Sequence, residues 1–455
     1  MKEFSGKGYA PYDPTHNSTS LFTSGNLFAA TVADFSATDS LIIKNNLRTE
    51  QYDYKHLNGG RQLRALLRTS NQHIVKRFNI IESFSAPDFV SSLEDEEHVY
   101  FFFREAAVEF MNCGKAVYSR VARVCKNDEG GSHKFRNRWT TFLKTRLNCS
   151  VPGDYPFYFD QIQSTTNFFP EGGAAAAVFY AVFTTPPNSI HGSAVCRFSL
   201  ADLDRSFEGN FKNQERVNSN WLAMSPSQVP QPRPGRCYNH TTKLPEASLH
   251  FIKNHCLMDE SVESRPAAPV FIKFGDSEIL TKIAAQRGVT DINGNKFDVL
   301  FIGTNRGKVI KTVVRADQPG HESSAVQEEM QIFPGGVPVL NLLLVESDGQ
   351  QPRLIVLSAD EVRSVAVDNC GEQPDCGACM TMGSLVCSWS LDTQTCTRHS
   401  EATNRSALLR SPAHCPAPTQ PTPGKPLSCM TFAEKNTNIY NRPIGCIFNI
   451  IYLMF

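Results

Sequence analysis

The chain has 455 residues, of which 45 are Lys or Arg and 45 are Asp or Glu, so its formal net charge at pH 7 is zero. This balance argues against a nucleic-acid binder or a protein of anionic membrane surfaces, because both classes use a net basic field. A hydrophobic share of 41%, including 31 Phe, supports a packed core and argues against wholesale disorder.

Two kinds of targeting segment are not visible in the sequence. A membrane-spanning helix needs about 20 consecutive apolar residues, and the longest candidate, 444–455, is shorter. The first residues, 1–13, lack the apolar stretch of a signal peptide. We therefore expect neither segment in this chain.

Most of the chain predicts short β-strands separated by turns. Apolar runs occur at 99–110, 175–185, 193–200, 297–314, 337–345 and 354–367. Thr304–Gly307 divides one run and predicts a hairpin. Asp202 and Asp204 alternate with apolar residues, which favours a solvated strand or turn. More than about 300 residues of this pattern exceed one β-sandwich. A propeller, which grows by adding four-stranded blades, suits the length best.

Three stretches depart from the strand pattern. The Pro-rich segment 226–234 leads into a predicted helix over 245–258, and together they resemble an insertion. Residues 59–85 are basic, and we favour a solvated loop there over a heparin-like patch, since basic runs are usually just exposed. Residues 416–425 form a Pro/Thr linker, and the tail after it shows no periodicity.

Cysteines are concentrated near the C-terminus. Six of the 14 lie in one short stretch: Cys370, Cys376, Cys379, Cys387, Cys396 and Cys415. Such crowding in a segment too small for its own core predicts a disulfide-stapled module in an oxidising compartment. Zinc is the alternative, because the Cys376-x-x-Cys379 spacing chelates metal. No second ligand pair follows at matching spacing, so we favour disulfides and expect no metal.

Four N-glycosylation sequons point to the same compartment. They begin at Asn17, Asn148, Asn239 and Asn404. Each sequon alone is a weak signal, but together with the cysteines they favour a secretory protein.

The sequence predicts no enzymatic activity and no cofactor. It has no nucleophile elbow, no P-loop and no dinucleotide fingerprint after a strand. His250 and His255 lack the i, i+4 spacing of a one-face zinc pair. Asp291, Asn293 and Asn295 echo a calcium loop, but no Glu closes it and its glycine is displaced to position 294. A type I′ hairpin turn at Asn293–Gly294 is the simpler interpretation.

Several ordered motifs resemble the sema domain of semaphorins. They are Gly6–Pro14 (GKGYAPYDP), Val99–Glu105 (VYFFFRE), Ser119–Lys126 (SRVARVCK), Trp139–Cys149 (WTTFLKTRLNC), Gly192–Cys196 (GSAVC), Pro232–Cys237 (PRPGRC) and Phe297–Thr304 (FDVLFIGT). Cys376–Cys379 with Cys387–Trp389 is similar to the cysteine-rich PSI module that follows this domain. Arg104–Glu105 and Asn112–Ala116 look most like the invertebrate transmembrane semaphorins. The resemblance covers most of 1–58 and 86–415.

The resemblance implies an all-β fold. We expect a seven-bladed β-propeller of the sema type, lacking its first blade, over 1–368. Within it, 59–85 is a non-family insert and 217–262 is an extrusion. A PSI module follows over 369–415, and 416–455 is an unstructured linker and tail. The implied disulfides are Cys125–Cys237, Cys149–Cys196, Cys370–Cys387, Cys376–Cys415 and Cys379–Cys396.

The resemblance also implies a function. The chain would be an extracellular guidance ligand, secreted or attached to the plasma membrane through a C-terminal anchor that is not visible here. It would bind plexin receptors, homodimerise through the propeller and the extrusion, and mostly repel axons and migrating cells. Two alternatives are a plexin- or Met-type receptor fragment and a truncated decoy that does not signal.

The loop Val32–Ser36 corresponds to a receptor-contacting loop of the family. We therefore expect Asp34 and Phe35 to contact plexin, because an exposed Phe among polar groups suits a binding hot spot. The alternative is that Phe35 packs under its own blade, since Phe is more often buried than exposed.

The chain departs from the family in three places. Ala10 stands where the family has a cysteine, so one family bridge cannot form. The insert 59–85 and the tail from Pro416 match nothing in the family. Our hypothesis is that both are unspliced or untranslated sequence. Sequencing the transcript across codons 58–87 tests it, and an insert retained in mature message would refute it.

Overall fold

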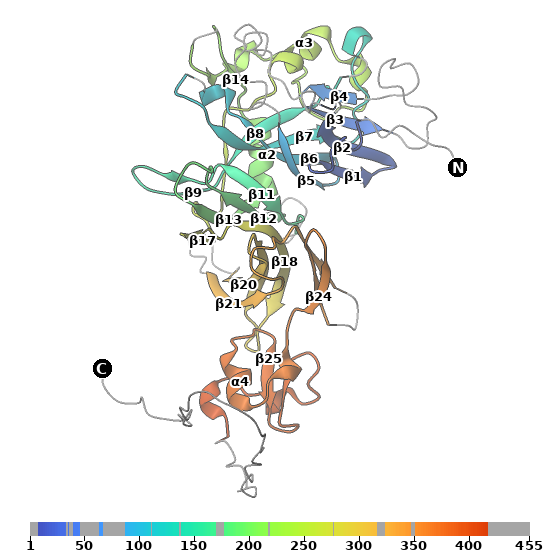
Figure 1. Ribbon diagram of the computed structural model, residues 1–455. Helices are drawn as coiled ribbons and strands as arrows, with labels where there is room; N and C mark the ends of the chain where they lie inside the picture. Colours follow the sequence, from blue (N-terminus) through green and yellow to red (C-terminus); the bar gives the residue numbers. More distant parts are fainter. Residues whose placement is uncertain are drawn as a thin grey trace, which may run out of the picture. The chain divides into compact units, whose positions relative to one another are not determined.

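The computed structural model describes residues 8–32, 35, 40–45, 63–66, 87–110, 112–135, 138–169, 177–216, 219–275, 277–315, 324–346 and 351–416. The chain divides into two compact units, Met1–His414 and Cys415–Phe455. Nearly all described residues belong to the first unit, which consists mainly of antiparallel sheets that follow one another along the chain (Figure 1).

Two sheets come from the N-terminal part of the chain. The first contains β1 (Thr19–Thr23), β2 (Asn26–Val32), β3 (Ser40–Asn45) and β4 (Leu63–Leu66), in that order. The second contains β5 (Asp88–Glu94), β6 (His98–Ala106), β7 (Val117–Cys125), β8 (Leu143–Asn148) and the short β16 (Val262–Glu263), which joins β8 in parallel. β4 lies inside 59–85, so the expectation of a solvated loop is wrong for these four residues.

Three more sheets follow. The third contains β11 (Gln161–Thr165), β12 (Val178–Thr184), β13 (Gly192–Ser199) and β17 (Phe271–Phe274). The fourth contains β18 (Leu280–Thr290), β19 (Lys296–Thr304), β20 (Lys308–Arg315) and β21 (Ser324–Gln331). The fifth contains β22 (Asn341–Val345), β23 (Arg353–Leu357) and β24 (Val362–Ala366).

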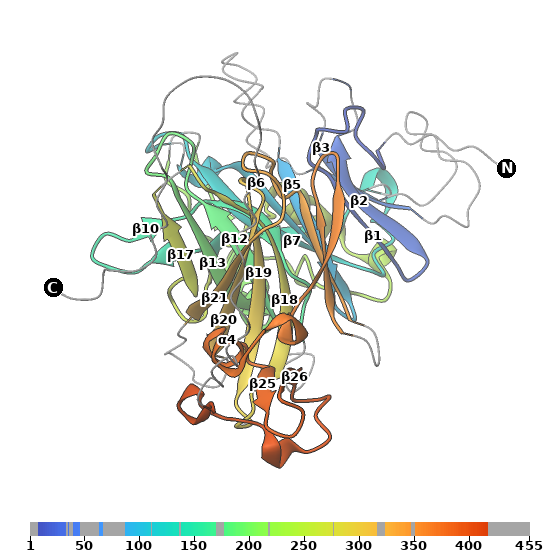
Figure 2. The same ribbon diagram turned by 60° about the horizontal axis from the view of Figure 1, so that its bottom comes forward.

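These five sheets are the blades of a β-propeller. The first strand of each sheet contacts the first strand of the next, from β1 through β5, β11 and β18 to β22. Figure 2 labels β1, β5 and β18 of this series. Apolar clusters fill the space between neighbouring sheets; one of them joins Phe28 of β2 to Phe101 of β6. The propeller arrangement is confirmed, with five blades in the described residues. Seven blades for the complete fold stay a prediction.

Shorter elements connect and follow the blades. Three two-stranded hairpins lie outside the blades: β9 (Ser150–Val151) with β10 (Phe157–Tyr158), β14 (Lys212–Asn213) with β15 (Leu222–Ala223), and β25 (Cys387–Ser390) with β26 (Thr395–Arg398), all within the described residues. The α-helices are α2 (Leu200–Glu208), α3 (Glu246–Asn254) and α4 (Cys376–Thr381). The predicted helix over 245–258 is therefore present but ends four residues earlier. One-turn 3-10 helices occur at Val108–Phe110, His133–Phe135, Pro226–Gln228, Thr241–Lys243, Cys370–Glu372, Arg405–Ala407 and Pro412–His414.

Two local predictions are wrong. Asp202 and Asp204 lie in helix α2, where the Ser199 hydroxyl accepts a hydrogen bond from the Asp202 amide and begins the helix as an N-cap. Asn293–Gly294 is a turn between β18 and β19, but of these two residues only Gly294 has a positive φ, whereas a type I′ turn needs two. The Asp291 carboxylate, which accepts from the amides of Asn293 and Asn295, holds this turn instead.

Candidate functional site

One end of the blades carries the most exposed apolar side chains of the described residues. In a meander blade the second and fourth strands run in the same direction. The second-to-third connections and the blade-to-blade connections therefore emerge on one face of the propeller. Tyr155, Phe35 and Ile190 are 96%, 84% and 70% exposed and lie on these connections. We call this end the loop face. Apolar groups left this exposed at one end make that end the candidate binding surface of the described residues.

Phe35 lies in the connection between β2 and β3. Its ring meets that of Tyr12, which is 51% exposed, edge-on with centroids 6.5 Å apart. Phe35 is therefore not packed under its own blade, and the burial alternative is wrong. Asp34 lies outside the described residues. The Tyr12–Phe35 pair presents two aromatic rings to solvent, which suits an anchor for a partner's pocket.

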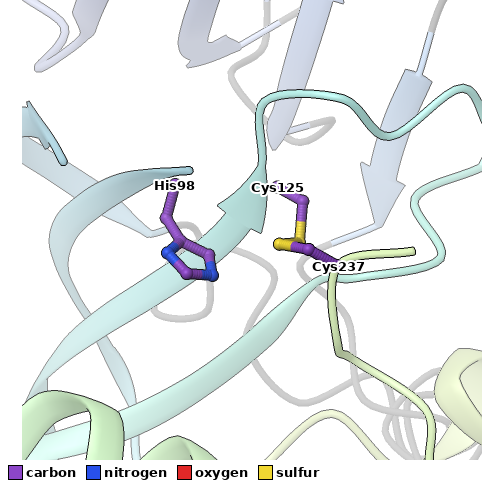
Figure 3. Close-up of side chains that lie close together, drawn as sticks. All are labelled: His98, Cys125 and Cys237. Carbon is purple, nitrogen blue, oxygen red and sulfur yellow. A yellow bond between two sulfur atoms is a disulfide. The ribbon is translucent and has the colours of Figure 1, made fainter. Parts of the chain in front are cut away.

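The disulfide Cys125–Cys237 joins the end of β7 to the segment 217–262 across 112 residues of sequence. A ring nitrogen of His98 and the two sulfur atoms lie within 4.8 Å of one another (Figure 3). This is the one metal-ligand-like grouping within the described ranges. The two cysteines are bonded to each other, so neither offers the thiolate that a metal site uses.

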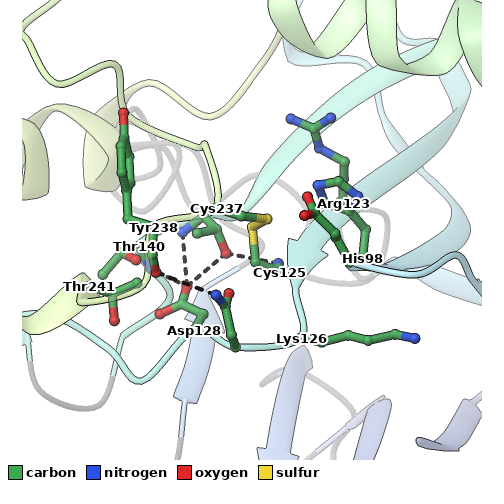
Figure 4. Close-up of a disulfide and its surroundings, with 12 residues drawn as sticks. His98, Arg123, Cys125, Lys126, Asp128, Thr140, Cys237, Tyr238 and Thr241 are labelled. Carbon is green, nitrogen blue, oxygen red and sulfur yellow. Dashed lines mark hydrogen bonds between the residues drawn. A yellow bond between two sulfur atoms is a disulfide. The ribbon is translucent and has the colours of Figure 1, made fainter. Parts of the chain in front are cut away.

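A buried carboxylate shapes the loop on which the segment 217–262 docks (Figure 4). Asp128 is fully buried and accepts hydrogen bonds from the amides of Gly130, Thr140 and Thr141 and from the Thr141 hydroxyl, at 2.7–3.0 Å. The loop then meets Thr241, whose hydroxyl donates to the Gly130 carbonyl at 3.0 Å and accepts from the Glu129 amide at 3.1 Å.

The same segment reaches the loop face at its beginning. The Asn112 side-chain amide, in the connection between β6 and β7, donates to the Ser219 carbonyl at 3.1 Å and to the Asn220 side-chain carbonyl at 3.3 Å. Helix α3 packs on the opposite flank, where His250 meets Phe135 edge-on. The segment 217–262 is therefore held by a disulfide, by backbone hydrogen bonds and by a side-chain link to the loop face.

A charge cluster lies inside the second blade. Arg120 donates to Glu105 at 3.0 Å and to Glu109 at 2.6 Å, and Lys144 donates to both oxygens of Glu105 at 2.6 and 2.9 Å. The side chains of Arg120 and Lys144 are 1% and 2% exposed. Burial acts to raise the pKa of Glu109, but the charge and hydrogen bond of Arg120 outweigh it and hold that pKa at about 2. The cluster fixes β6, β7 and β8 beneath the β6–β7 connection.

The C-terminal cysteines form covalent bonds. The structure contains Cys149–Cys196 in the propeller, and Cys370–Cys387 and Cys379–Cys396 around α4 and β25. Cys376 and Cys415 are also disulfide-bonded. This excludes zinc at Cys376 and Cys379, because a disulfide sulfur is not a thiolate ligand. Cys113 is free and exposed, and Cys256 is free and buried.

The four sequons differ in their surroundings. Asn17, Asn239 and Asn404 are exposed. Asn148 ends β8, and its side-chain amide donates to Glu263 of β16 at 2.6 Å. Because the Asn148 side-chain nitrogen is engaged with Glu263, the folded chain presents this acceptor less readily than the other three.

Sequence reasoning missed part of the loop face. Tyr12, Tyr155 and Ile190 were not among the predicted site residues, although all three are strongly exposed. Ile190 had a usable signal, since it follows Pro186-Pro187-Asn188-Ser189 as a single apolar residue in a turn. A single apolar residue surrounded by turn-forming residues has no neighbours in sequence with which to form a core.

The comparisons with known proteins agree with this fold. A family model described as "Sema domain" matches residues 162–346. Semaphorin-1A of Schistocerca americana is 47% identical over 394 residues, which cover 85% of this chain and 50% of that protein. Semaphorin-1A of Drosophila melanogaster is 42% identical and covers 87% of this chain and 42% of that protein. The chain thus spans about half the length of the curated relatives it matches.

Solved structures are also similar. Drosophila Semaphorin 1b, extracellular domains 1–2, is 40% identical with a TM-score of 0.76, over 90% of this chain and 75% of that chain. Semaphorin 1a, extracellular domains 1–2, is 41% identical with a TM-score of 0.75, over 91% and 78%. The fold is therefore that of a sema-type propeller protein. The chain belongs to the semaphorin family.

Two further structures bear on partners and on the alternatives. Semaphorin 1b is also solved as a complex with Drosophila Plexin A, and there it is 40% identical to this chain with a TM-score of 0.75, over 89% of this chain and 74% of that chain. The extracellular region of Plexin A4 has a TM-score of 0.60 at 16% identity, which shows a shared fold alone. No helix in the described part of the chain is long and apolar enough to cross a membrane.

Proposed function

We propose that this chain is the receptor-binding part of an extracellular guidance ligand that binds a plexin through its loop face. The main support for this proposal is that the three most exposed large apolar side chains of the described residues lie on connections of the loop face. The relative solved with Plexin A supports the class of partner. The ligand acts by presenting a rigid surface, without catalysis, and its output is mostly repulsion of axons and migrating cells.

The receptor-fragment alternative is less well supported. The chain is 40% identical to Semaphorin 1b but 16% identical to Plexin A4. A receptor fragment would bind a semaphorin ectodomain instead of a plexin ectodomain. Pull-down of the secreted chain with each ectodomain distinguishes the two functions, and binding to the semaphorin alone would reverse our assignment.

The first prediction concerns Phe35. We expect Phe35→Ala to weaken binding to a plexin A ectodomain about 30-fold, because truncating a central aromatic anchor costs about 2 kcal/mol. Surface plasmon resonance on the immobilised ectodomain measures this loss. The matched control is Phe22→Ala, which removes a Phe that is 59% exposed beside the β1–β2 turn, at the other end of the strands. Equal affinities of Phe35→Ala and the parent chain would remove Phe35 from the interface.

The second prediction concerns assembly. We propose a homodimer formed through the propeller and the extrusion 217–262, because a dimer clusters two receptors and adds avidity. Analytical ultracentrifugation of the secreted chain is expected to give about twice the 50.6 kDa of one chain plus its glycans. A monomer at micromolar concentration that still binds plexin would favour the decoy function.

We also propose the division of the chain into modules. The propeller occupies 1–368, a PSI module 369–415 and a linker with tail 416–455. The chain acts outside the cell or at its surface, with glycans on Asn17, Asn239 and Asn404, and on Asn148 only when the transfer precedes folding. A glycopeptide map measures the occupancy of each of the four sequons. Full occupancy of Asn148 on chain that is glycosylated only after folding would contradict the proposal.

A further inference from the structure

The disulfide Cys125–Cys237 has a histidine ring beside it, which distinguishes it from the other propeller disulfide, Cys149–Cys196. His98 of β6 lies directly opposite Cys125 of β7 in the antiparallel register, so the imidazole is built into the disulfide's surroundings by strand pairing. A ring nitrogen lies within 4.8 Å of both sulfur atoms. Cys149–Cys196 has no such neighbour among the described residues.

Asp95 fixes the position of the His98 ring. Nδ1 of the ring lies 3.2 Å from an Asp95 carboxylate oxygen, which also accepts from the Tyr100 hydroxyl at 2.7 Å. The other Asp95 oxygen accepts from the His98 amide at 2.6 Å. Burial acts to raise the pKa of Asp95, but hydrogen bonds from His98 and Tyr100 hold it at about 2. Asp95 is therefore a carboxylate that orients the His98 ring. Figure 3 shows this ring beside the disulfide.

The two sulfur atoms are unequally accessible. Cys125 is 1% exposed and its amide donates to the Thr141 hydroxyl at 3.1 Å, so it is fixed in the blade. Cys237 is part-exposed and lies on the segment 217–262, between the exposed Arg236 and the part-exposed Tyr238; Figure 4 shows Cys237 and Tyr238. An external thiolate reaches Cys237 first, which makes Cys125 the leaving group beside His98.

We propose that Cys125–Cys237 is a reducible switch in which His98 acts as the acid for the leaving Cys125 thiolate. The reductant is an external dithiol. Its thiolate attacks Cys237, the Cys125–Cys237 bond breaks, and the Cys125 sulfur takes the bonding electron pair and a proton from His98. The second thiol of the reductant then attacks the reductant's own sulfur in the mixed disulfide, and the Cys237 sulfur leaves with the bonding electron pair and takes that thiol's proton. The proton that the first thiol lost to solvent restores His98. The chain gains two electrons and two protons, and the reductant becomes a cyclic disulfide.

The physical reason is the stability of the leaving group. The rate of thiol–disulfide exchange rises as the departing thiolate becomes easier to form, and a positioned proton donor makes it easier. The structural consequence is local. Opening the bond removes the covalent tie between the stretch 232–238 and β7 and leaves this stretch on noncovalent contacts, such as the ion pair of Arg236 with Glu208. Thr241 and α3 keep their own contacts with the Asp128 loop and with Phe135. The switch therefore loosens one arm of the extrusion without unfolding the blade.

The test is timed reduction of the secreted full chain by dithiothreitol at fixed pH, followed by alkylation and mass spectrometry. We expect Cys125 and Cys237 to be labelled at least about tenfold faster than Cys149 and Cys196. His98→Gln keeps a hydrogen-bonding side chain opposite Cys125 but offers no acid. We expect it to slow labelling of Cys125 and Cys237 about tenfold and to leave Cys149 and Cys196 protected.

Cys149–Cys196 reports at the same time whether the variant is folded, because both residues are at most 1% exposed. Hydrogen exchange of the selectively reduced parent chain is expected to be faster at 235–238 and unchanged in α3. Equal reduction rates for the two propeller disulfides, or an unchanged rate in His98→Gln with Cys149–Cys196 intact, would overturn the proposal. If hydrogen exchange at 235–238 were unchanged after reduction, the proposal that the disulfide is a switch would be wrong.

Discussion

Replacing Arg120 by alanine is expected to lower the free energy of unfolding by about 4 kcal/mol. Arg120 is buried between Glu105 and Glu109, and no water reaches it to replace its hydrogen bonds. Its removal leaves the buried Glu105 and the part-buried Glu109 carboxylates with one buried ammonium, that of Lys144. The cost comes from the uncompensated charge and not from the loss of an attraction, because intact buried pairs contribute little net stability. Urea unfolding followed by tryptophan fluorescence measures the change.

The matched control for Arg120 is Lys308→Ala. Lys308 pairs with Glu329 at 3.2 Å, but their side chains are 33% and 43% exposed. We expect a loss below about 1 kcal/mol there. A similarly small loss for Arg120→Ala would show that the cluster in the second blade is solvated.

The contribution of Glu109 to the free energy of unfolding also depends on pH, because its pKa is lowered from 4.5 to about 2 on folding. That contribution is fully present above about pH 5 and is lost as the pH falls toward 2.

Replacing Asp128 by alanine is expected to cost about 3 kcal/mol and to loosen the docking of the segment 217–262. Four buried donors from Gly130, Thr140 and Thr141 would lose their acceptor. The Gly130 carbonyl that receives Thr241 is part of the same loop, so the segment loses a fixed partner. Urea unfolding measures the loss of stability. Faster hydrogen exchange at 238–244 would report the looser docking of the segment 217–262.

Asp291→Ala is the control for Asp128. The Asp291 carboxylate also accepts several hydrogen bonds, from Asn293 and Asn295, but in a turn open to water. Water replaces the lost acceptor there, so we expect a loss below about 1 kcal/mol. If Asp128→Ala and Asp291→Ala cost the same, burial of the donors is not what makes Asp128 important.

The sequence could predict elements whose pattern is local. The run Val99–Glu105 is apolar and aromatic throughout, and it forms the centre of a blade as β6. The helix α2 was missed although Leu200, Leu203 and Phe207 follow a helical spacing and are all buried. Nine residues are too few for periodicity to outweigh the strand before them, so the apolar pattern alone does not distinguish this helix from a continued strand.

Other features depend on contacts far apart in the chain. The parallel pairing of β16 with β8 joins residues more than a hundred positions apart, and two residues carry no pattern that could reveal it. The loop face is a property of blade topology, since Phe35, Tyr155 and Ile190 belong to three different connections. Phe35 was identified through the family resemblance, whereas Tyr155 and Ile190 needed the fold.

The loop face itself can be tested by hydrogen exchange of the chain with and without a plexin A ectodomain. Our account predicts protection of peptides covering 26–45 and 107–116, which carry the β2–β3 and β6–β7 connections, with no change at the β1–β2 turn. Protection confined to the other end of the blades, such as the β1–β2 and β18–β19 turns, or a complex that protects no loop-face peptide, would contradict it.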